Sequence, residues 1–282
     1  MRYLLPLSPQ ESKLRGLKVR SPDRASFLET DVGVSTLLLL RIIEGASSNG
    51  IDWRRCIKLL KNPIEHMLSK RSDNDDGCEV LYGRAGFLYA LLLIRSTRRR
   101  CRADSTDSES LPFPDELQES LERLTSDDNI RTIVEAIIDI GREGAREYAA
   151  DIAGRGLMIP PLMWVWHGKR YLGAAHGVAG ILQMLWNCPS HIVLPYMTDM
   201  AGTLMWLVGQ QDKSGSWPTK APSTREIEDN ELVQYVLRLI ETLSLMCLTS
   251  DVRTDGVMAL PELSFYYPQS SDDHFPFRNV FQ

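Results

Sequence analysis

A glycine-rich segment and an apolar run lie next to each other in PLMWVWHGKRYLGAAHGVAGILQML, residues 161–185. At its centre, glycines and alanines at residues 173–180 surround the imidazole of His176, and an apolar run with helical spacing follows. This pattern predicts a helix that carries His176 in its first turn, with glycines that let neighbouring backbone approach closely. Two interpretations of His176 stay open at this point: a satisfied core histidine, or a functional group at the mouth of the helix.

The Gly-x-Ala-Gly pattern occurs twice in the chain. Residues 83–86 read GRAG and residues 177–180 read GVAG, and each is followed by an apolar helical pattern and then an amphipathic one. Residues 30–33, TDVG, precede an earlier apolar run and keep a single glycine of the pattern. Such a repeat predicts stacked helical hairpins.

Helical periodicity extends through most of the chain, and strand signals are few, so the sequence predicts an all-α fold. We expect a polar loop from Arg98 to Ser110 and a solvated turn at Asp73–Gly77 that binds no calcium. The expected helices run from an Asp31 cap to Glu44, over residues 53–70 and 114–124, from a cap at Asp127 or Asp128 to residue 149, over residues 190–209, and over residues 235–248.

Composition and charge exclude several classes of protein. The net charge of -5 does not suggest a nucleic-acid binder. The apolar runs are shorter than the roughly 20 residues that span a bilayer, so no transmembrane segment is predicted. The first residues lack the continuous apolar region of a secretory signal, and we expect a cytoplasmic protein. Peripheral membrane contact through the arginines of residues 98–102 is the alternative to a solvated linker there.

The five cysteines are scattered along the chain without a Cys-x-x-Cys pair. This pattern indicates reduced thiols rather than a disulfide framework. It also argues against a zinc site built from local cysteine pairs.

Several segments together resemble the LanC-like (lanthionine synthetase C-like) family, the eukaryotic relatives of the bacterial lanthipeptide cyclases. They are PLM with Trp166, GAAHGVAG at residues 173–180, GRAGFLYALL at residues 83–92, SGSWP at residues 214–218 and ELVQ at residues 231–234. The resemblance implies an α/α toroid (barrel) whose inner helices open on an active-site floor. It also implies that His176 and residues 79–82 lie close together.

The resemblance implies a chemistry as well. LanC-like enzymes use zinc to acidify a thiol, which adds to the double bond of a dehydroamino acid. In eukaryotic relatives this thiol is thought to be that of glutathione. By this resemblance His176 is the candidate catalytic acid or base, a role that suits histidine as a residue type. Tyr82, Arg84, Gly173 and Gly177 are the candidate substrate-binding residues.

The sequence departs from the family pattern after Gln234. Residues 235–239 read YVLRL where the family has Trp-Cys-His-Gly, and the later Cys-His pair is also missing. Cys247 does not replace these zinc ligands, because His274 is the only histidine after it and has no paired cysteine. We therefore expect no zinc in this chain as written, although zinc is the cofactor of the family.

This departure predicts three segments: a loose leader at residues 1–29, a LanC-like portion of an incomplete toroid at residues 30–234, and a divergent tail at residues 235–282. The chain has material for about four hairpins where a family toroid has about seven. We expect a truncated member, produced either by real divergence or by a gene model that reads through an intron after Gln234.

Three functions follow from these observations. The first is an inactive binding remnant that takes glutathione, a peptide or a protein partner, and that self-associates through uncovered helix faces. The second is an active glutathione or lanthionine-type transferase, if the sequence after Gln234 is an artefact. The third is a six-hairpin glycosidase-like carbohydrate enzyme that uses Glu79 and Asp199 as its two carboxylates.

Overall fold

The computed structural model describes residues 25, 27–28, 30–45, 50–69, 77–104, 113–213, 215–223 and 232–233. Nearly all of the expected leader, the whole of the expected tail and the helix expected over residues 235–248 lie outside these ranges. So does most of the turn expected at Asp73–Gly77. The three expected segments stay a prediction.

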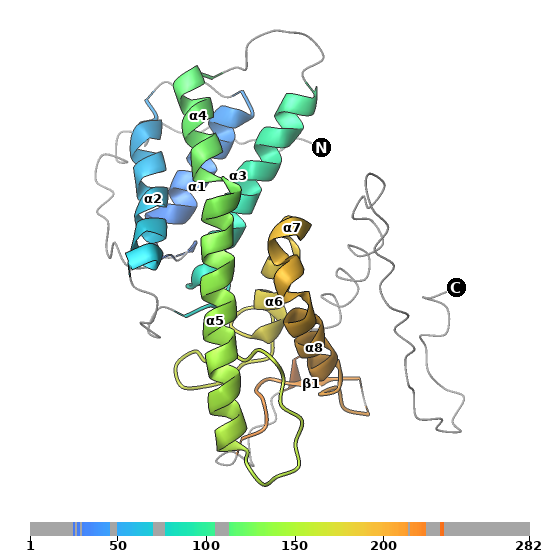
Figure 1. Ribbon diagram of the computed structural model, residues 1–282. Helices are drawn as coiled ribbons and strands as arrows, with labels where there is room; N and C mark the ends of the chain where they lie inside the picture. The colour runs from blue at the N-terminus through green and yellow to red at the C-terminus, as the bar shows by residue number, and fades with distance from the viewer. Residues whose placement is uncertain are drawn as a thin grey trace. The chain divides into compact units, whose positions relative to one another are not determined.

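Helices dominate the described residues, which confirms the predicted all-α class (Figure 1). Strand structure in the described ranges is one antiparallel pair, in which Trp217 lies opposite Val233. The elements are α1 (Asp31–Ile43), α2 (Trp53–Ser69), α3 (Arg84–Asp104), α4 (Asp115–Leu124), α5 (Asp127–Asp151), α6 (Val178–Trp186), α7 (Ser190–Val193), the 3-10 helix η2 (Leu194–Tyr196), α8 (Met197–Val208), β1 (Trp217–Pro218) and β2 (Leu232–Val233).

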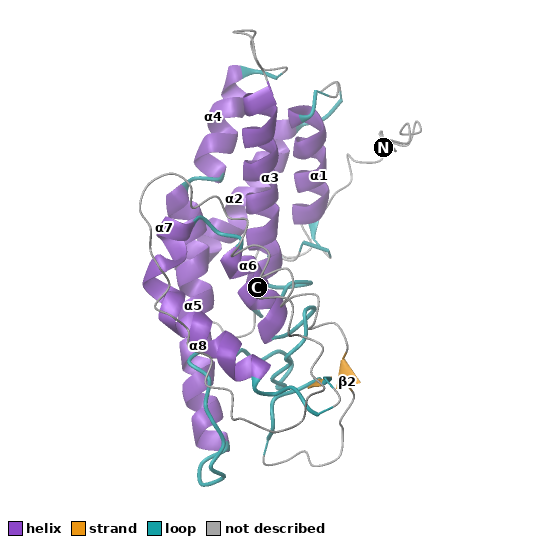
Figure 2. Ribbon diagram, turned by 90° about the vertical axis from the view of Figure 1, so that its right-hand side faces the viewer, coloured by secondary structure: helices purple, strands orange, loops and turns teal. Residues whose placement is uncertain are grey.

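The helices pack as stacked hairpins in two rows. In the first row α1 packs against α3 and α3 against α6, and Figure 2 shows α1 and α3 side by side. In the second row α2 contacts α4 and α5, and α5 contacts α7. Each first-row helix also packs against a helix outside that row, as α1 on α2, α3 on α5 and α6 on α8. The predicted hairpins are confirmed, whereas the toroid stays a prediction.

Each first-row helix has as its third residue a glycine that the backbone requires. A Cβ atom would lie 2.1 Å from the carbonyl oxygen of Phe27 at Gly33, 2.0 Å from that of Val80 at Gly86, and 1.9 Å from that of Ala174 at Gly180. In all three cases the carbonyl belongs to the residue six positions earlier, in the turn that leads into the helix. Gly33, the one glycine kept in the degraded copy, is therefore the one that this turn needs.

The caps of α1 and α5 differ from the prediction. Thr30, not Asp31, caps α1, and its hydroxyl accepts a hydrogen bond from the Val32 N–H at 3.3 Å. Ser126, not Asp127 or Asp128, caps α5 and accepts from the Asn129 N–H at 3.3 Å. The hydroxyl residues hold the extended cap position, and the aspartates lie in the first turn, where the helix dipole favours negative charge.

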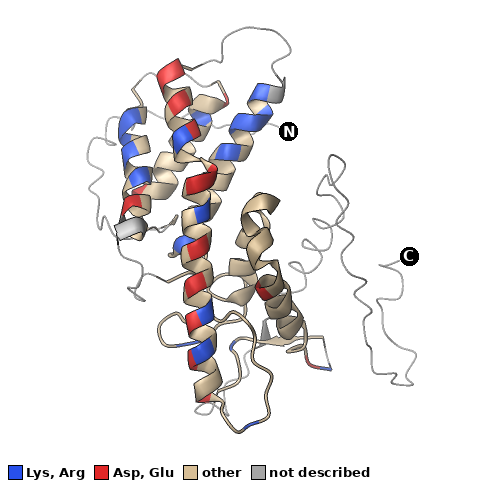
Figure 3. Cartoon of the chain, viewed as in Figure 1, with Lys and Arg blue, Asp and Glu red and all other residues tan. Residues whose placement is uncertain are grey.

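The polar loop predicted from Arg98 is wrong for its first part, because α3 continues to Asp104. Arg98 and Arg102 lie 3.9 and 3.7 Å from the carboxylate of Glu122 on α4. In Figure 3 the blue colour of lysine and arginine recurs along the last turns of α3. Positive charge near a helix C-terminus interacts favourably with the helix dipole, which helps this arginine run to stay helical.

Two further helix predictions need correction. The single helix expected over residues 190–209 is divided into α7, η2 and α8, because Pro195 has no N–H to donate inside a helix. The helix expected to carry His176 in its first turn begins later, with Gly177 as its N-cap and Val178 as its first residue. His176 therefore lies just before α6.

No helix within the described ranges combines the length and the apolar character that crossing a membrane requires.

Two glycines of the same motif give a matched test of this packing. Replacing Gly180 by alanine places a methyl group 1.9 Å from the Ala174 oxygen and 2.8 Å from Val80 Cγ2. We expect Gly180→Ala to lower the free energy of unfolding by about 2–3 kcal/mol in urea denaturation. Gly173→Ala is the control, because no neighbouring atom lies within 4 Å of its added Cβ. Equal effects of the two changes would contradict the packing described.

Candidate functional site

The site begins with a buried carboxylate. Glu79 is 1% exposed and lies in the turn before α3. One of its oxygens, Oε2, accepts a hydrogen bond from the Leu81 N–H at 2.8 Å, and the other, Oε1, accepts from the Tyr82 N–H. A buried carboxylate needs such donors, because water cannot reach it. The turn of residues 79–82 therefore wraps its own amides around Glu79.

His176 supplies a further partner for this carboxylate. Its Nδ1 lies 2.9 Å from Glu79 Oε2, and the Val80 N–H nearby donates to the Ala175 carbonyl at 3.1 Å. Because a carboxylate only accepts hydrogen bonds, Nδ1 carries the proton in this pair. In the neutral ring Nε2 is then left unprotonated and available to a ligand.

Aromatic rings surround the imidazole. The indole of Trp166 stacks on His176 with ring centroids 4.2 Å apart and an angle of 4° between the planes. The ring of Tyr82 lies 5.8 Å from the imidazole at 23°, and that of Tyr171 lies 5.9 Å away at 53°. These rings limit how His176 can rotate, and its side chain is 26% exposed.

A tight hairpin turn presents Trp166. The N–H of Trp166 donates to the Lys169 carbonyl at 2.9 Å, and the N–H of Lys169 donates back at 3.0 Å. The two residues between them, His167 and Gly168, have φ angles of 50° and 71°. Two consecutive positive φ angles are typical of the type I′ turn, which joins two antiparallel segments directly.

The segment before this turn is fixed on α5. A Cβ at Gly144 would lie 2.2 Å from the Met163 carbonyl oxygen, and the Met163 N–H donates to the Gly141 carbonyl at 2.8 Å. The buried ring of Trp164 donates to the carbonyl of Ile137 at 2.9 Å. These contacts fix the position of the hairpin relative to α5.

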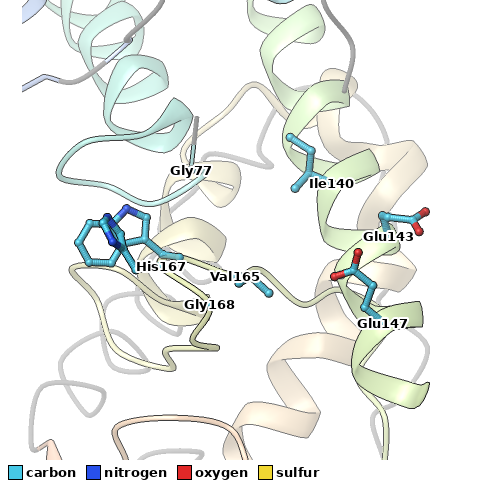
Figure 4. A pocket seen from close by; sticks show the side chains of 9 residues that line it. Gly77, Ile140, Glu143, Glu147, Val165, His167 and Gly168 are labelled. Carbon is cyan, nitrogen blue, oxygen red and sulfur yellow. The ribbon is translucent and has the colours of Figure 1, made fainter. Parts of the chain in front are cut away.

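A cavity of about 280 Å³ lies between this hairpin and α5 (Figure 4). Trp166 belongs both to the wall of the cavity and to the stack on His176. The cavity is lined by Gly77, Ile140, Glu143, Gly144, Glu147, Val165, Trp166, His167 and Gly168.

The expectation that His176 lies close to residues 79–82 is confirmed. Arg84 is 5% exposed, and its side chain interacts with the thiol of Cys78 through its charge and a hydrogen bond. Gly177 approaches the backbone of Tyr171, where a Cβ would lie 2.4 Å from the carbonyl oxygen, while Gly173 has open space around it. The catalytic and substrate-binding roles expected of these residues stay predictions.

Three features of the site were not predicted: Glu79 as the partner of His176, the stacked Trp166, and the two glutamates of the cavity. Glu79 gave a signal in the sequence, since a lone acid stands between Cys78 and Val80 in an otherwise apolar segment. Asp199, the second carboxylate of the glycosidase hypothesis, is bound by Arg142, with Nη2 at 2.7 Å and Nε at 2.9 Å. Glu79 and Asp199 therefore each have a partner of their own.

The described residues do not fit a zinc ion. Within the described ranges, no three side chains of His, Cys, Asp or Glu lie together as a metal-binding group. Burial raises the pKa of the Cys78 thiol to about 11, although the charge of Arg84 opposes this, and it raises the pKa of the Cys188 thiol to about 12. Zinc binds the thiolate, which these two cysteines do not readily form. Cys247 lies outside the described residues.

The two rows of hairpins, with an imidazole and a carboxylate meeting where the first-row helices begin, define an all-helical repeat protein with a candidate site at its helix mouths. Residues 13–231 match the sequence profile of the family described as lanthionine synthetase C-like protein. The chain belongs to this family.

Two curated relatives match parts of the chain. The chain is 32% identical over 158 residues to "LanC-like protein GCL1" of Arabidopsis thaliana, and this match covers 56% of this chain and 28% of that protein. It is 30% identical over 108 residues to "Glutathione S-transferase LANCL1" of Danio rerio, and this match covers 38% of this chain and 20% of that protein. The chain thus matches less than a third of the length of either relative.

Thiol labelling tests the burial of the cysteines. Cys101 is half-buried, whereas Cys78 and Cys188 are buried and their thiols have raised pKa values. Brief alkylation of the native protein at neutral pH, followed by mass spectrometry, should modify Cys101 well before the other two, because the thiolate is the reacting form. Labelling in urea, where all the cysteines should react, is the control. Native labelling of Cys78 or Cys188 as fast as Cys101 would contradict the structure.

Proposed function

We propose that this chain is a binding member of the LanC-like family, whose site at His176 holds a thiol-containing peptide of the glutathione class. The observation that carries the proposal is the bond of 2.9 Å between Glu79 Oε2 and His176 Nδ1. This bond turns Nε2 into an acceptor for a ligand S–H or, once protonated, a donor to a ligand carboxylate. The glutathione transferase name of the Danio rerio relative supports this choice of ligand.

In this proposal the predicted site residues have distinct roles. The ring of Tyr82 is a wall against which the peptide lies, and the open space at Gly173 admits the ligand close to the backbone. Arg84 acts through its charge, because its side chain is buried. Gly177 contributes by letting the turn before α6 close on Tyr171. No step passes through zinc, because neither the residues after Gln234 nor the described cysteines fit it.

The proposal keeps the self-association expected of an incomplete toroid. Leu37 on α1 and Met205 on α8 are 56% and 48% exposed, and both are large apolar side chains. Such residues are the candidate contacts between copies or with a protein partner. A cytoplasmic location remains part of the same proposal.

A second candidate function is catalysis of thiol addition without a metal, which the fixed orientation of His176 favours. Nε2 would accept the proton of the ligand thiol while the sulfur bonds to Cβ of a dehydroalanine residue and the double-bond electrons move towards Cα. The imidazolium would then return the proton to Cα, so that atoms and charge balance. We rank this below binding, because a thiol with a pKa near 8.5 is mostly protonated at neutral pH without a metal.

Calorimetric titration with glutathione tests the binding proposal. We expect His176→Asn to weaken binding about tenfold, which corresponds to about 1.4 kcal/mol for a hydrogen bond lost in the site. His191→Asn is the matched control, because His191 also bonds a carboxylate, that of Asp127 at 2.7 Å, but stands on α7. Failure of glutathione to bind, or equal loss in both variants, would contradict the proposal.

A reaction assay separates the two candidate functions. Glutathione and a dehydroalanine peptide are incubated with the protein, and the thioether product is measured by mass spectrometry. Binding without any increase in product over buffer supports the binding role. An increase that disappears in His176→Asn favours the catalytic role instead.

A further inference from the structure

We infer that the cavity between α5 and the hairpin of residues 165–168 binds the cationic side chain, lysine or arginine, of a peptide ligand. The inference rests on the proposed function, in which a peptide lies at His176. It names a chemical class for a second part of the ligand, beyond the thiol.

The shape and lining of the cavity fit such a side chain. Ile140 and Val165 give it an apolar surface, and both are partly buried. Lysine and arginine carry a stem of methylene groups that packs on apolar surface while the charged head stays near polar groups. A volume of about 280 Å³ accommodates one such side chain rather than a larger body.

The charge of the cavity is negative. Glu143 and Glu147 lie one helical turn apart on α5, both are exposed, and both line the cavity. Figure 4 shows their carboxylates projecting from α5, with the ring of His167 on the far side of Val165. Glu143 pairs with Arg146, whereas Glu147 has no ion-pair partner among the described residues. Two carboxylates at this spacing repel each other, and a cation between them relieves the repulsion.

Two ring-bearing side chains of the hairpin, Trp166 and His167, also line the cavity. The methylene stem of a lysine or arginine packs on such surfaces while its charged head stays near polar groups. A pair of glutamates on a bare helix face would offer neither these rings nor the apolar surface of Ile140 and Val165. The cavity therefore provides what an ordinary acidic pair lacks.

The position of the cavity connects it to His176. Trp166 lines the cavity and stacks on the imidazole at 4.2 Å, so one ring separates the two places. A peptide residue at His176 therefore has a neighbouring side chain within reach of the cavity. The same charges disfavour an anionic group there, so the carboxylates of a glutathione-like ligand would lie elsewhere.

Three dipeptide probes test the inference: acetyl-Cys-Lys-amide, acetyl-Cys-norleucine-amide and acetyl-Cys-Glu-amide. Their affinities for the full chain are measured by calorimetric titration or by chemical-shift titration. We expect the lysine probe to bind about threefold to fivefold more tightly than the norleucine probe, which has a similar stem without the charge, and the glutamate probe to bind least. Equal affinity for lysine and norleucine would overturn the inference.

Two double variants test whether the preference for lysine arises at the cavity. The double variant Glu143→Gln with Glu147→Gln should lose the preference for lysine, and its exposed positions make loss of folding unexpected. The control double variant, Glu116→Gln with Glu119→Gln on α4, removes the same charge from exposed positions outside the cavity lining and should keep the preference. Equal loss in both double variants would show a general charge effect and overturn the inference.

The glutathione titration separates this inference from the proposed function. Glutathione binding without a preference for lysine overturns the cavity inference alone. A preference for lysine without glutathione binding supports the cavity inference and overturns the glutathione assignment alone.

Discussion

A carboxylate removed from water must find hydrogen-bond donors, and Glu79 shows how this requirement organises the fold. Two donors come from the adjacent turn, and the remaining one comes from His176, 97 positions later in the chain. Removing these hydrogen bonds would leave the buried charge of Glu79 without compensation, which is strongly destabilising. The turn before α3 and the turn before α6 must therefore meet in one register, and the Val80–Ala175 backbone bond lies beside the same contact. The interaction that joins two repeats is the one that orients the imidazole.

The repeated turn explains much of what the sequence predicted. Gly33, Gly86 and Gly180 each leave room for a carbonyl six positions earlier, so a short local motif was enough to predict the hairpins. Local patterns predicted the structure less well where two sequence signals compete. At the start of α5 a serine and two aspartates are all good caps, and only the backbone at Ser126 decides between them. Near Pro195, apolar periodicity suggested a continuous helix that the missing N–H interrupts.

The candidate site was likewise predicted where local patterns were enough and missed where distant segments meet. His176 was predicted because its neighbours form a local motif, and the resemblance placed it near residues 79–82. The partnership with Glu79, the stack of Trp166 and the glutamates of α5 depend on contacts between distant segments, which periodicity does not encode. The family match over residues 13–231 includes the first-row helices and His176. The proposal of binding, with a thiol at the imidazole and a cation at α5, draws on the acidic cavity and on the departure from the family pattern expected after Gln234.

The protonation of His176 decides the proposed function, because the role of the imidazole towards a ligand depends on which ring nitrogen is free. Nitrogen NMR of protein labelled with ¹⁵N-histidine distinguishes the two nitrogens, and the His176→Asn variant assigns the signal among the five histidines. We predict that the neutral ring carries its proton on Nδ1, next to Glu79, and that Nε2 is unprotonated. A proton on Nε2, or rapid exchange between the two forms as in a free imidazole, would contradict this prediction.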